Sequence, residues 1–323
     1  MNINQISELT KQDMADVNSE IRTRLTSDIT LINKLVQYIV NSGGKRIRPM
    51  ITLLIARALH YKKVQHVTIA TLIEFIHTAT LLHDDVVDKS HMRRGKITTN
   101  MIFGNTASIL VGDFIYTRAF QMMTELESLR ILSLMADAVN IIAEGEMLQL
   151  TNRNNPSITI DNYMKIIYSK TARLFEVASQ SSAILADANA YQEKALRNYG
   201  RYVGIAFQLI DDLLDYNASE TIFGKNIGND LNEGKPTLPL LHAIHHSTPK
   251  QALLIRQAIK QGNNRHSLNI ILDTMNQHGS LEYTRQRAET EINKAISCLK
   301  ILPPSPYRQA LASLATYVIQ RIH

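Results

Sequence analysis

The apolar residues of this chain recur every three or four positions over long stretches. No proline occurs between Pro49 and Pro156, and within this interval Ile69, Leu72 and Ile76 show the spacing. Such spacing places apolar side chains on one face of an α-helix, whereas a strand would alternate at every second position. Several segments are apolar on most of their faces, which predicts helices at the centre of a fold.

Short polar or glycine-rich segments separate the predicted helices. They lie at residues 41–46, 93–100, 152–157, 223–237 and 302–307. No repeat of fixed period, low-complexity tract or linker-like change in composition divides the chain. The pattern therefore predicts an all-α protein with one large helical domain over residues 1–323.

The composition is that of a globular protein with mixed charges. Of the 323 residues, 45% are hydrophobic and 20% are charged, and the net charge is +6. No run of like charge indicates a nucleic-acid partner. The single cysteine, Cys298, excludes a disulfide within the chain and fits a reducing compartment. We see no signal peptide and no apolar window long enough to span a bilayer, so we expect a cytoplasmic protein.

Two copies of the pattern Asp-Asp-x-x-Asp lie in apolar segments, at residues 84–88 and 211–215. Helical residues four apart lie about 40° apart around the axis, so Asp84 and Asp88 share a direction and Asp85 lies to the side. Oxygen ligands without cysteine or a close histidine pair favour Mg²⁺, which proteins hold with few carboxylates plus substrate phosphates. One copy alone would more often be a solvated acidic face. Two copies, each expected in mid-helix, predict a diphosphate site where the motifs face one another across a cavity.

Basic residues accompany the first acidic turn. GGKRIRP, residues 43–49, places Lys45 and Arg48 in a glycine-loosened loop before a helix, and Arg93 and Arg94 follow the turn. Loop amides and a helix N-terminus suit an anion, and the planar guanidinium matches phosphate oxygens. Each residue alone would be an ordinary surface charge, but their common position predicts phosphate binding.

His77 lies on the same helical stripe as Asp84 and Asp88, because seven and eleven residues are close to whole numbers of turns. It is either a ligand-binding side chain or a hydrogen-bonded core histidine. His83 points in a different direction from the stripe, so we expect it to be structural.

Five blocks of the sequence resemble the signature blocks of the trans-prenyltransferases, the all-helical isoprenyl diphosphate synthases. The blocks are GGKRIRP, LLHDDVVD with MRRGK, SKTARLF, FQLIDD with LLD, and GKN…DLNEGKPTLP. They occur in the family order between residues 43 and 239. The resemblance implies the isoprenoid synthase fold, with a central cavity between helices.

The same resemblance implies head-to-tail condensation of isopentenyl diphosphate with an allylic diphosphate such as farnesyl diphosphate. It also implies three Mg²⁺ ions in the active site and a homodimer. The product implied is of octaprenyl length, for the side chain of ubiquinone. Because that product is hydrophobic, we expect at most transient membrane contact when it is released.

Roles are carried over from the family only where a residue matches a motif position. The residues that match catalytic positions are Asp84, Asp85, Asp88, Lys170, Asp211, Asp212 and Lys225. Those that match the isopentenyl diphosphate site are Lys45, Arg48, His77 and Arg94. Those that match contacts to the allylic diphosphate are Arg93, Lys170, Thr171, Gln208, Lys225 and Lys235. The metal ligands implied are Asp84, Asp88, Asp211 and Asp215.

One position departs from the family pattern. Close relatives tend to have two acids where this chain has Asn229 followed by Asp230. We expect a weaker negative charge around the metals there, with activity retained.

The length of the product should depend on the residues one turn below the first acidic motif. Family members with short products place a bulky side chain there, whereas this chain has Ala79 and Thr80. The small residues predict an open tunnel and a long product. Phe120, Met123 and Met135 are candidates for its floor, although such residues more often belong to a plain core. Products of seven, eight or nine units all remain compatible with the residues.

Two other functions share part of this pattern. A class I terpene cyclase has the helical fold and one acidic motif, but it normally carries a different second metal motif. A non-catalytic partner subunit of a heteromeric synthase usually lacks acids or basic contacts that are complete here. Product analysis with isopentenyl diphosphate tests the first alternative, and activity of the chain expressed alone tests the second.

Overall fold

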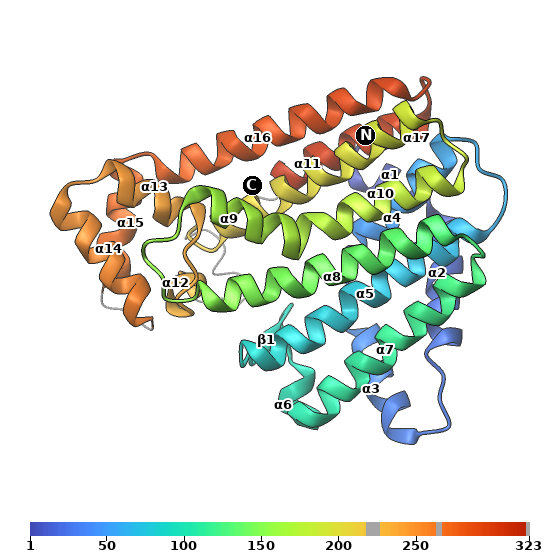
Figure 1. Ribbon diagram of the computed structural model, residues 1–323, viewed down its shortest axis with the longest axis horizontal. Helices are drawn as coiled ribbons and strands as arrows, with labels where there is room; N and C mark the ends of the chain where they lie inside the picture. Colours follow the sequence, from blue (N-terminus) through green and yellow to red (C-terminus); the bar gives the residue numbers. More distant parts are fainter. Residues whose placement is uncertain (218–226, 263–266, 321–323) are drawn as a thin grey trace. The chain divides into compact units, whose positions relative to one another are not determined.

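The structure is a computed structural model, and it describes residues 1–217, 227–262 and 267–320 (Figure 1). Helices dominate these residues. The strands among them are β1 (Met92–Arg93) and β2 (Lys96–Ile97), which form a short antiparallel hairpin. The predicted all-α class is confirmed, and the hairpin replaces part of the loop expected at 93–100.

The chain divides into two compact units. The first consists of Met1–Val139, Val177–Arg197 and Leu299–Ser313. The second consists of Asn140–Glu176, Asn198–Cys298 and the chain from Leu314 onward. A single domain over residues 1–323 stays a prediction.

The first unit is built around one apolar helix. Its own elements are α1 (Ile3–Leu9), α2 (Lys11–Arg24), α3 (Thr30–Asn41), α4 (Ile47–Ala58), α5 (Gln65–Val87), α6 (Thr99–Phe103), α7 (Asn105–Glu125) and η4 (Leu299–Ile301). Helix α5 packs against α2, α4 and α7, and α7 runs beside it in Figure 1. Ile69, Leu72 and Ile76 are fully buried on α5. The helical spacing of the sequence therefore identified the central helix of this unit.

A buried ion cluster ties α2 to its neighbours in the first unit. Asp13 is 6% exposed and accepts hydrogen bonds from Arg57 on α4, at 2.8 Å from Nε and 2.5 Å from the terminal nitrogen. His66 on α5 places Nε2 3.2 Å from the same carboxylate. Burial alone would raise the pKa of Asp13, but the hydrogen bonds from Arg57 and His66 outweigh burial and hold that pKa well below its usual value.

The second unit has elements of its own and shares four helices with the first. Its own elements are α9 (Ile160–Ile167), η1 (Tyr168–Ala172), α12 (Asn229–Asn232), α13 (Leu238–His246), α14 (Pro249–Gln261), α15 (Leu268–Gln277) and α16 (Ser280–Cys298). The helices that contribute residues to both units are α8 (Leu129–Thr151), α10 (Arg173–Leu185), α11 (Ala190–Leu214) and α17 (Pro306–Gln320).

Two local features determine how η1 and α11 pack together in the second unit, near the second acidic motif. The element η1 is a π-helical turn between α9 and α10, a wider turn than an α-helix makes and one that is often found at functional sites. Gly204 on α11 packs directly against that turn, since a Cβ there would lie 2.5 Å from the Cα of Ala172. A side chain at position 204 would push α11 away from η1.

Among the described residues, no helix is both long enough and apolar enough to cross a membrane.

Candidate active site

The first acidic turn lies at the C-terminal end of α5. Asp84 is in the last turn of the helix and Asp88 is its C-cap, whose backbone N–H donates to the carbonyl of Asp84 at 2.8 Å. Both side chains are half-buried. We expected the turn in mid-helix, so its position is a correction. The C-terminus of a helix carries partial negative charge, so carboxylates there require a counter-charge even more strongly.

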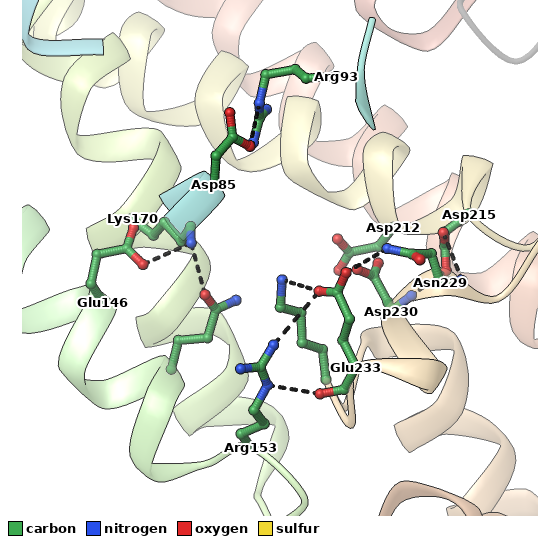
Figure 2. A network of polar contacts seen from close by, with 12 residues as sticks. Asp85, Arg93, Glu146, Arg153, Lys170, Asp212, Asp215, Asn229, Asp230 and Glu233 are labelled. Carbon is green, nitrogen blue, oxygen red and sulfur yellow. Dashed lines mark hydrogen bonds and ion pairs between the residues drawn. The ribbon is translucent and has the colours of Figure 1, made fainter. Parts of the chain in front are cut away.

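Asp85 differs from its two neighbours because it is paired within the protein. It is 3% exposed, and its Oδ1 accepts from Arg93 at 2.9 Å (Nε) and 2.8 Å (terminal nitrogen) (Figure 2). Burial raises the pKa of Asp85, and the Arg93 guanidinium opposes that rise. The hairpin β1–β2 carries Arg93 back to the end of α5. In this structure Arg93, the predicted diphosphate contact, is the counter-ion of Asp85.

The residues predicted to bind isopentenyl diphosphate are gathered in the first unit. Arg94 donates to the carbonyl of Gly43, and a Cβ on Gly44 would lie 2.5 Å from its guanidinium. The pKa of His77 lies well below its usual value, chiefly through burial and then through the positive charges of Arg48, Arg94 and Arg93. His77 is therefore neutral at neutral pH and close to these arginines. Lys45 is exposed in the loop that precedes α4.

A cavity of about 90 Å³ lies beside this basic group in the first unit. Arg46, Arg93 and Arg94 line it together with the apolar side chains of Phe75 and Leu82. Arg46 has a left-handed backbone and places its guanidinium 3.5 Å from Glu74. A cavity with apolar walls and guanidinium groups in its lining suits a small phosphorylated apolar molecule.

The second acidic turn ends α11, and its middle residue is again paired within the protein. Asp212 is 3% exposed and accepts from Tyr163 at 2.6 Å and from Gln208 at 2.7 Å. Thr171 in the π-helical turn donates to the other end of Gln208 at 2.7 Å. Burial, followed by the nearby charge of Asp230, raises the pKa of Asp212 well above its usual value. Thr171 and Gln208, both predicted diphosphate contacts, thus lie in one chain of hydrogen bonds with Asp212.

Asp215 anchors the segment that carries α12. Its Oδ1 accepts from the backbone N–H of Asn229 at 3.2 Å, and its Oδ2 from that of Asp230 at 2.9 Å. These are N–H groups at the start of α12, where a carboxylate is stabilising (Figure 2). Asp211, like Asp215, is half-buried, and it lies in the last turn of α11. The role of Asp211 and Asp215 as metal ligands stays a prediction, and the contacts of Asp215 favour a structural role.

Two predicted diphosphate-binding lysines in the second unit each pair with a glutamate. Lys170, in the π-helical turn, donates to Glu146 at 2.7 Å (Figure 2), and Nζ of Lys235 lies 2.6 Å from Oε2 of Glu233. The third predicted lysine, Lys225, lies outside the described residues. The sequence had identified the lysines but neither glutamate.

Glu233 is held by two further residues besides Lys235. Asn229 donates to its other carboxylate oxygen at 2.6 Å, and Arg153 donates to its backbone carbonyl at 2.8 Å. The guanidinium of Arg153 also lies 3.8 Å from Oε2 of Glu233, the carboxylate oxygen that Lys235 contacts. The unusual Asn229 therefore has a defined place, because its amide donates to Glu233 where a carboxylate would be repelled.

The predicted chain-length residues lie in the first unit, and one of them differs from the others. Ala79, Met123 and Met135 are buried, and Thr80 is half-buried with its hydroxyl bonded to the carbonyl of His77. Phe120 is 38% exposed. Phe120 and Met123 are three residues apart on α7, so they point in directions about 60° apart. Phe120 thus lies at the surface of this chain, and the assignment of the tunnel floor to Phe120, Met123 or Met135 stays a prediction.

The donor atoms of the two acidic turns fit a hard cation such as Mg²⁺. Asp84 and Asp88 offer carboxylate oxygens from one side of α5, and Asp211 offers another from α11. Mg²⁺ is commonly bound by one or two carboxylates, with substrate phosphates and water as the other ligands. In the part of the chain that is described, no group of three or more histidine, cysteine or acidic residues has the arrangement of a metal site.

Comparison with known proteins identifies the family of this chain. A model of the polyprenyl synthetase family matches residues 29–275. The octaprenyl diphosphate synthase of Escherichia coli (strain K12) is 65% identical over 321 residues, with 99% of each chain covered. That of Haemophilus influenzae is 57% identical and covers 99% of this chain and 98% of the relative. A crystal structure of a polyprenyl synthase from Caulobacter crescentus CB15, complexed with calcium and isoprenyl diphosphate, is 40% identical, with a TM-score of 0.94 over 100% of this chain and 98% of that one.

The chain belongs to the polyprenyl synthetase family. Within the family it is a long-chain trans-polyprenyl diphosphate synthase, a prenyltransferase, as the signature blocks predicted. The fold of the isoprenoid synthases is likewise confirmed. Neither the terpene cyclase nor the non-catalytic subunit is favoured by these comparisons.

Four residues that the structure places among the predicted site residues were missed at the level of sequence: Glu146, Gln149, Tyr163 and Glu233. Glu146 and Gln149 are polar residues three apart in the apolar segment AEGEMLQL, so their helical spacing was a usable signal. Tyr163 carries no such signal, because only the folded chain brings it to Asp212, whereas Glu233 lies two residues before Lys235 within the block DLNEGKPTLP.

Proposed function

We propose that this protein extends farnesyl diphosphate with isopentenyl diphosphate units, head to tail, to all-trans octaprenyl diphosphate for a quinone side chain. The observation that carries the proposal is the pair of acidic turns, at the ends of α5 and α11, each with cationic side chains in its own unit. The length of eight units is supported by the two relatives that are octaprenyl diphosphate synthases.

Mg²⁺ is the cofactor in this proposal, with three ions per active site. Asp84, Asp88 and Asp211 would hold the ions, and Asp215 is a further candidate. When bound, the ions supply positive charge that stabilises the diphosphate as it leaves. The Caulobacter crescentus neighbour, which holds calcium and isoprenyl diphosphate, supports an oxygen-ligated divalent cation.

Each group of basic residues has a separate task in the proposed reaction. Lys45, Arg48 and Arg94 bind isopentenyl diphosphate, with neutral His77 donating an N–H to a phosphate oxygen. Lys170 and Lys235, with Arg93, Thr171, Gln208 and Lys225, hold the allylic diphosphate and offset the charge that develops on it. Asp85 and Asp212 act through their partners, since both are buried and paired.

Carbon–carbon bond formation follows loss of the diphosphate from the allylic substrate. The double bond of isopentenyl diphosphate attacks the allylic cation, and a proton then leaves the new chain. The chain's own contribution is to orient the two diphosphates and to exclude water that would quench the cation. The apolar helices and small residues Ala79 and Thr80 would leave room for the growing product.

A homodimer is part of the proposal. Helices α6 and α7 leave five large apolar side chains 38% to 61% exposed: Met101, Ile102, Ile109, Leu110 and Phe120. Ile109 and Phe120 lie on one face of α7, since eleven residues make about three turns. Apolar groups gathered at a surface are typical of an interface. Light scattering of the purified chain should give twice the monomer mass, and Leu110→Lys should lower it.

We also propose that the protein acts in the cytoplasm and contacts the membrane only when the hydrophobic product leaves. The lone half-buried Cys298 is compatible with a reducing compartment. Cell fractionation tests this: the protein should remain in the supernatant after membranes are pelleted.

Product analysis tests the function directly. The purified chain is incubated with farnesyl diphosphate, radiolabelled isopentenyl diphosphate and Mg²⁺, and the dephosphorylated products are separated by length. A dominant octaprenyl product is expected. Products that stop at farnesyl or geranylgeranyl length would overturn the open tunnel while keeping the chemistry. A folded chain that incorporates nothing would overturn the proposed function.

A further inference from the structure

The π-helical turn Tyr168–Ala172 packs unusually closely on α8. Gly145 faces the turn, and a Cβ at this position would lie 2.6 Å from the Cβ of Ser169 and 3.0 Å from the backbone nitrogen of Lys170. Any larger residue would separate the two elements. Gly145 therefore sets the distance between α8 and the backbone of Lys170.

The side chains of Glu146 and Gln149 on α8 accept hydrogen bonds from the ammonium of Lys170. Nζ of Lys170 donates to Oε2 of Glu146 at 2.7 Å (Figure 2) and to Oε1 of Gln149 at 2.8 Å. The two acceptors are three residues apart and so lie on one side of α8. The side chains of Lys170 and Glu146 are 21% and 30% exposed, so the pair is accessible from outside the protein core.

We propose that Gly145, Glu146 and Gln149 form a positioning device that fixes the ammonium of Lys170 for the allylic diphosphate. The inference rests on the proposed function, because it assumes that Lys170 contacts this diphosphate. None of the three residues touches the substrate in the proposal. They act on the reaction through Lys170 and are positioning residues.

The chemistry of lysine explains why such a device is needed. Lysine has a flexible four-carbon stem and loses considerable rotamer freedom when its head group is fixed. Two acceptors on one helix face fix the head group before the substrate arrives. The charge of Glu146 also balances that of Lys170 while no diphosphate is present. A preorganised cation needs little rearrangement when charge develops on the leaving diphosphate.

The first test compares two glutamine variants on the same helix. Glu146→Gln removes the charge but keeps the size of the side chain. Glu144→Gln is the matched control, because Glu144 is exposed on α8 and its carboxylate accepts from Asn140. Single-turnover condensation of farnesyl diphosphate with one isopentenyl unit should be about tenfold slower in Glu146→Gln, as expected for a misplaced catalytic group. The KM for isopentenyl diphosphate should change less than twofold.

A double-mutant cycle separates positioning from simple stabilisation. If Glu146 acts through Lys170, Glu146→Gln should slow the reaction less than twofold in a Lys170→Ala background. A full tenfold loss in that background would overturn the inference. Glu146→Asp keeps the charge but withdraws it by about one carbon–carbon bond, roughly 1.5 Å, and should recover part of the rate.

The remaining outcomes are also decisive. If Glu146→Gln does not fold, as judged by loss of helical circular dichroism, Glu146→Asp and Gln149→Leu serve in its place, each with an expected loss of about threefold. Equal rates for the Glu146 and Glu144 variants, with an active wild-type chain, would overturn the positioning role alone. An inactive wild-type chain would instead overturn the proposed function and this inference with it.

Discussion

The hydroxyl of Tyr163 on α9 donates a hydrogen bond of 2.6 Å to Oδ2 of Asp212 on α11. Both residues are 3% exposed. Burial, and then the charge of Asp212, raises the pKa of Tyr163 well above its usual value, so the proton stays on the tyrosine. The middle aspartate of the second motif is therefore held as an acceptor inside the protein.

Replacing Tyr163 by phenylalanine should destabilise the protein. The change leaves a buried carboxylate with one donor fewer, which typically costs about 1–3 kcal/mol in the free energy of unfolding. Urea unfolding of Tyr163→Phe measures this loss. Tyr191→Phe is the control, since Tyr191 is 81% exposed. Equal midpoints for the two variants would show that the hydrogen bond contributes nothing to stability.

Replacing Asp84 in the first motif and Asp215 in the second should change the Mg²⁺ requirement of the enzyme to different extents. Asp215 accepts two backbone N–H groups, so we expect Asp215→Asn to leave the Mg²⁺ concentration for half-maximal activity within about twofold of wild type. Asp84→Asn removes a proposed ligand and should raise that concentration about tenfold or more. Mg²⁺ titrations of the initial rate measure both. An equally large increase for Asp215→Asn would make it a metal ligand.

The cluster of Asp13, Arg57 and His66 predicts a pH dependence of stability. Because the folded-state pKa of Asp13 is lowered, its contribution is complete above the unfolded pKa of about 3.9 and is lost as the pH falls below it. At pH 7, Asp13→Asn should cost about 2 kcal/mol in the free energy of unfolding, the scale of charged hydrogen bonds.

Urea unfolding at pH 7 and at pH 3 tests this sign. The difference between wild type and Asp13→Asn should shrink at the lower pH, since the wild-type carboxyl begins to be protonated on unfolding. Asp16→Asn serves as control, because Asp16 is exposed on the same helix. A difference that grows as the pH falls would contradict the assigned shift.

A bulky residue below the first acidic turn should shorten the product. Thr80 lies one turn before Asp84 on α5 and is half-buried, and one turn, about 5.4 Å, is roughly the length of one isoprene unit. Thr80→Phe should therefore shift the products to fewer units, with the first condensation retained. Thr117→Phe on the exposed side of α7 is the control. Unchanged product lengths in Thr80→Phe would place the tunnel elsewhere.

The sequence predicted the helices well, because helical spacing is local, and it grouped the candidate site residues by matching blocks. Ile69, Leu72 and Ile76 are buried as their period required, and Arg48 and Arg94 lie close enough to His77 for their charges to lower its pKa. The burial follows from the helical period, and the grouping of these basic residues follows from the matching sequence blocks.

The parts that the sequence did not predict depend on contacts between distant residues. The pairing of Asp85 with Arg93 requires the β1–β2 hairpin. Strands of only two residues leave no recognisable pattern in the sequence. The anchoring of Asp215 requires the return of the chain at Asn229. Such pairings are fixed by tertiary structure, so they could not be derived from helical period alone.

The π-helical turn Tyr168–Ala172 also limits how the length of this chain can change. A π-turn completes one turn with one residue more than an α-helical turn. Deleting one residue within 168–172 would return the segment to α-helical geometry and leave the phase of α9 nearly unchanged. The bulge that presents Lys170 to Glu146 and Thr171 to Gln208 would be lost, although no side chain outside the turn had been substituted. Insertions and deletions should accordingly be tolerated in the loop at 152–157 far better than in these five positions.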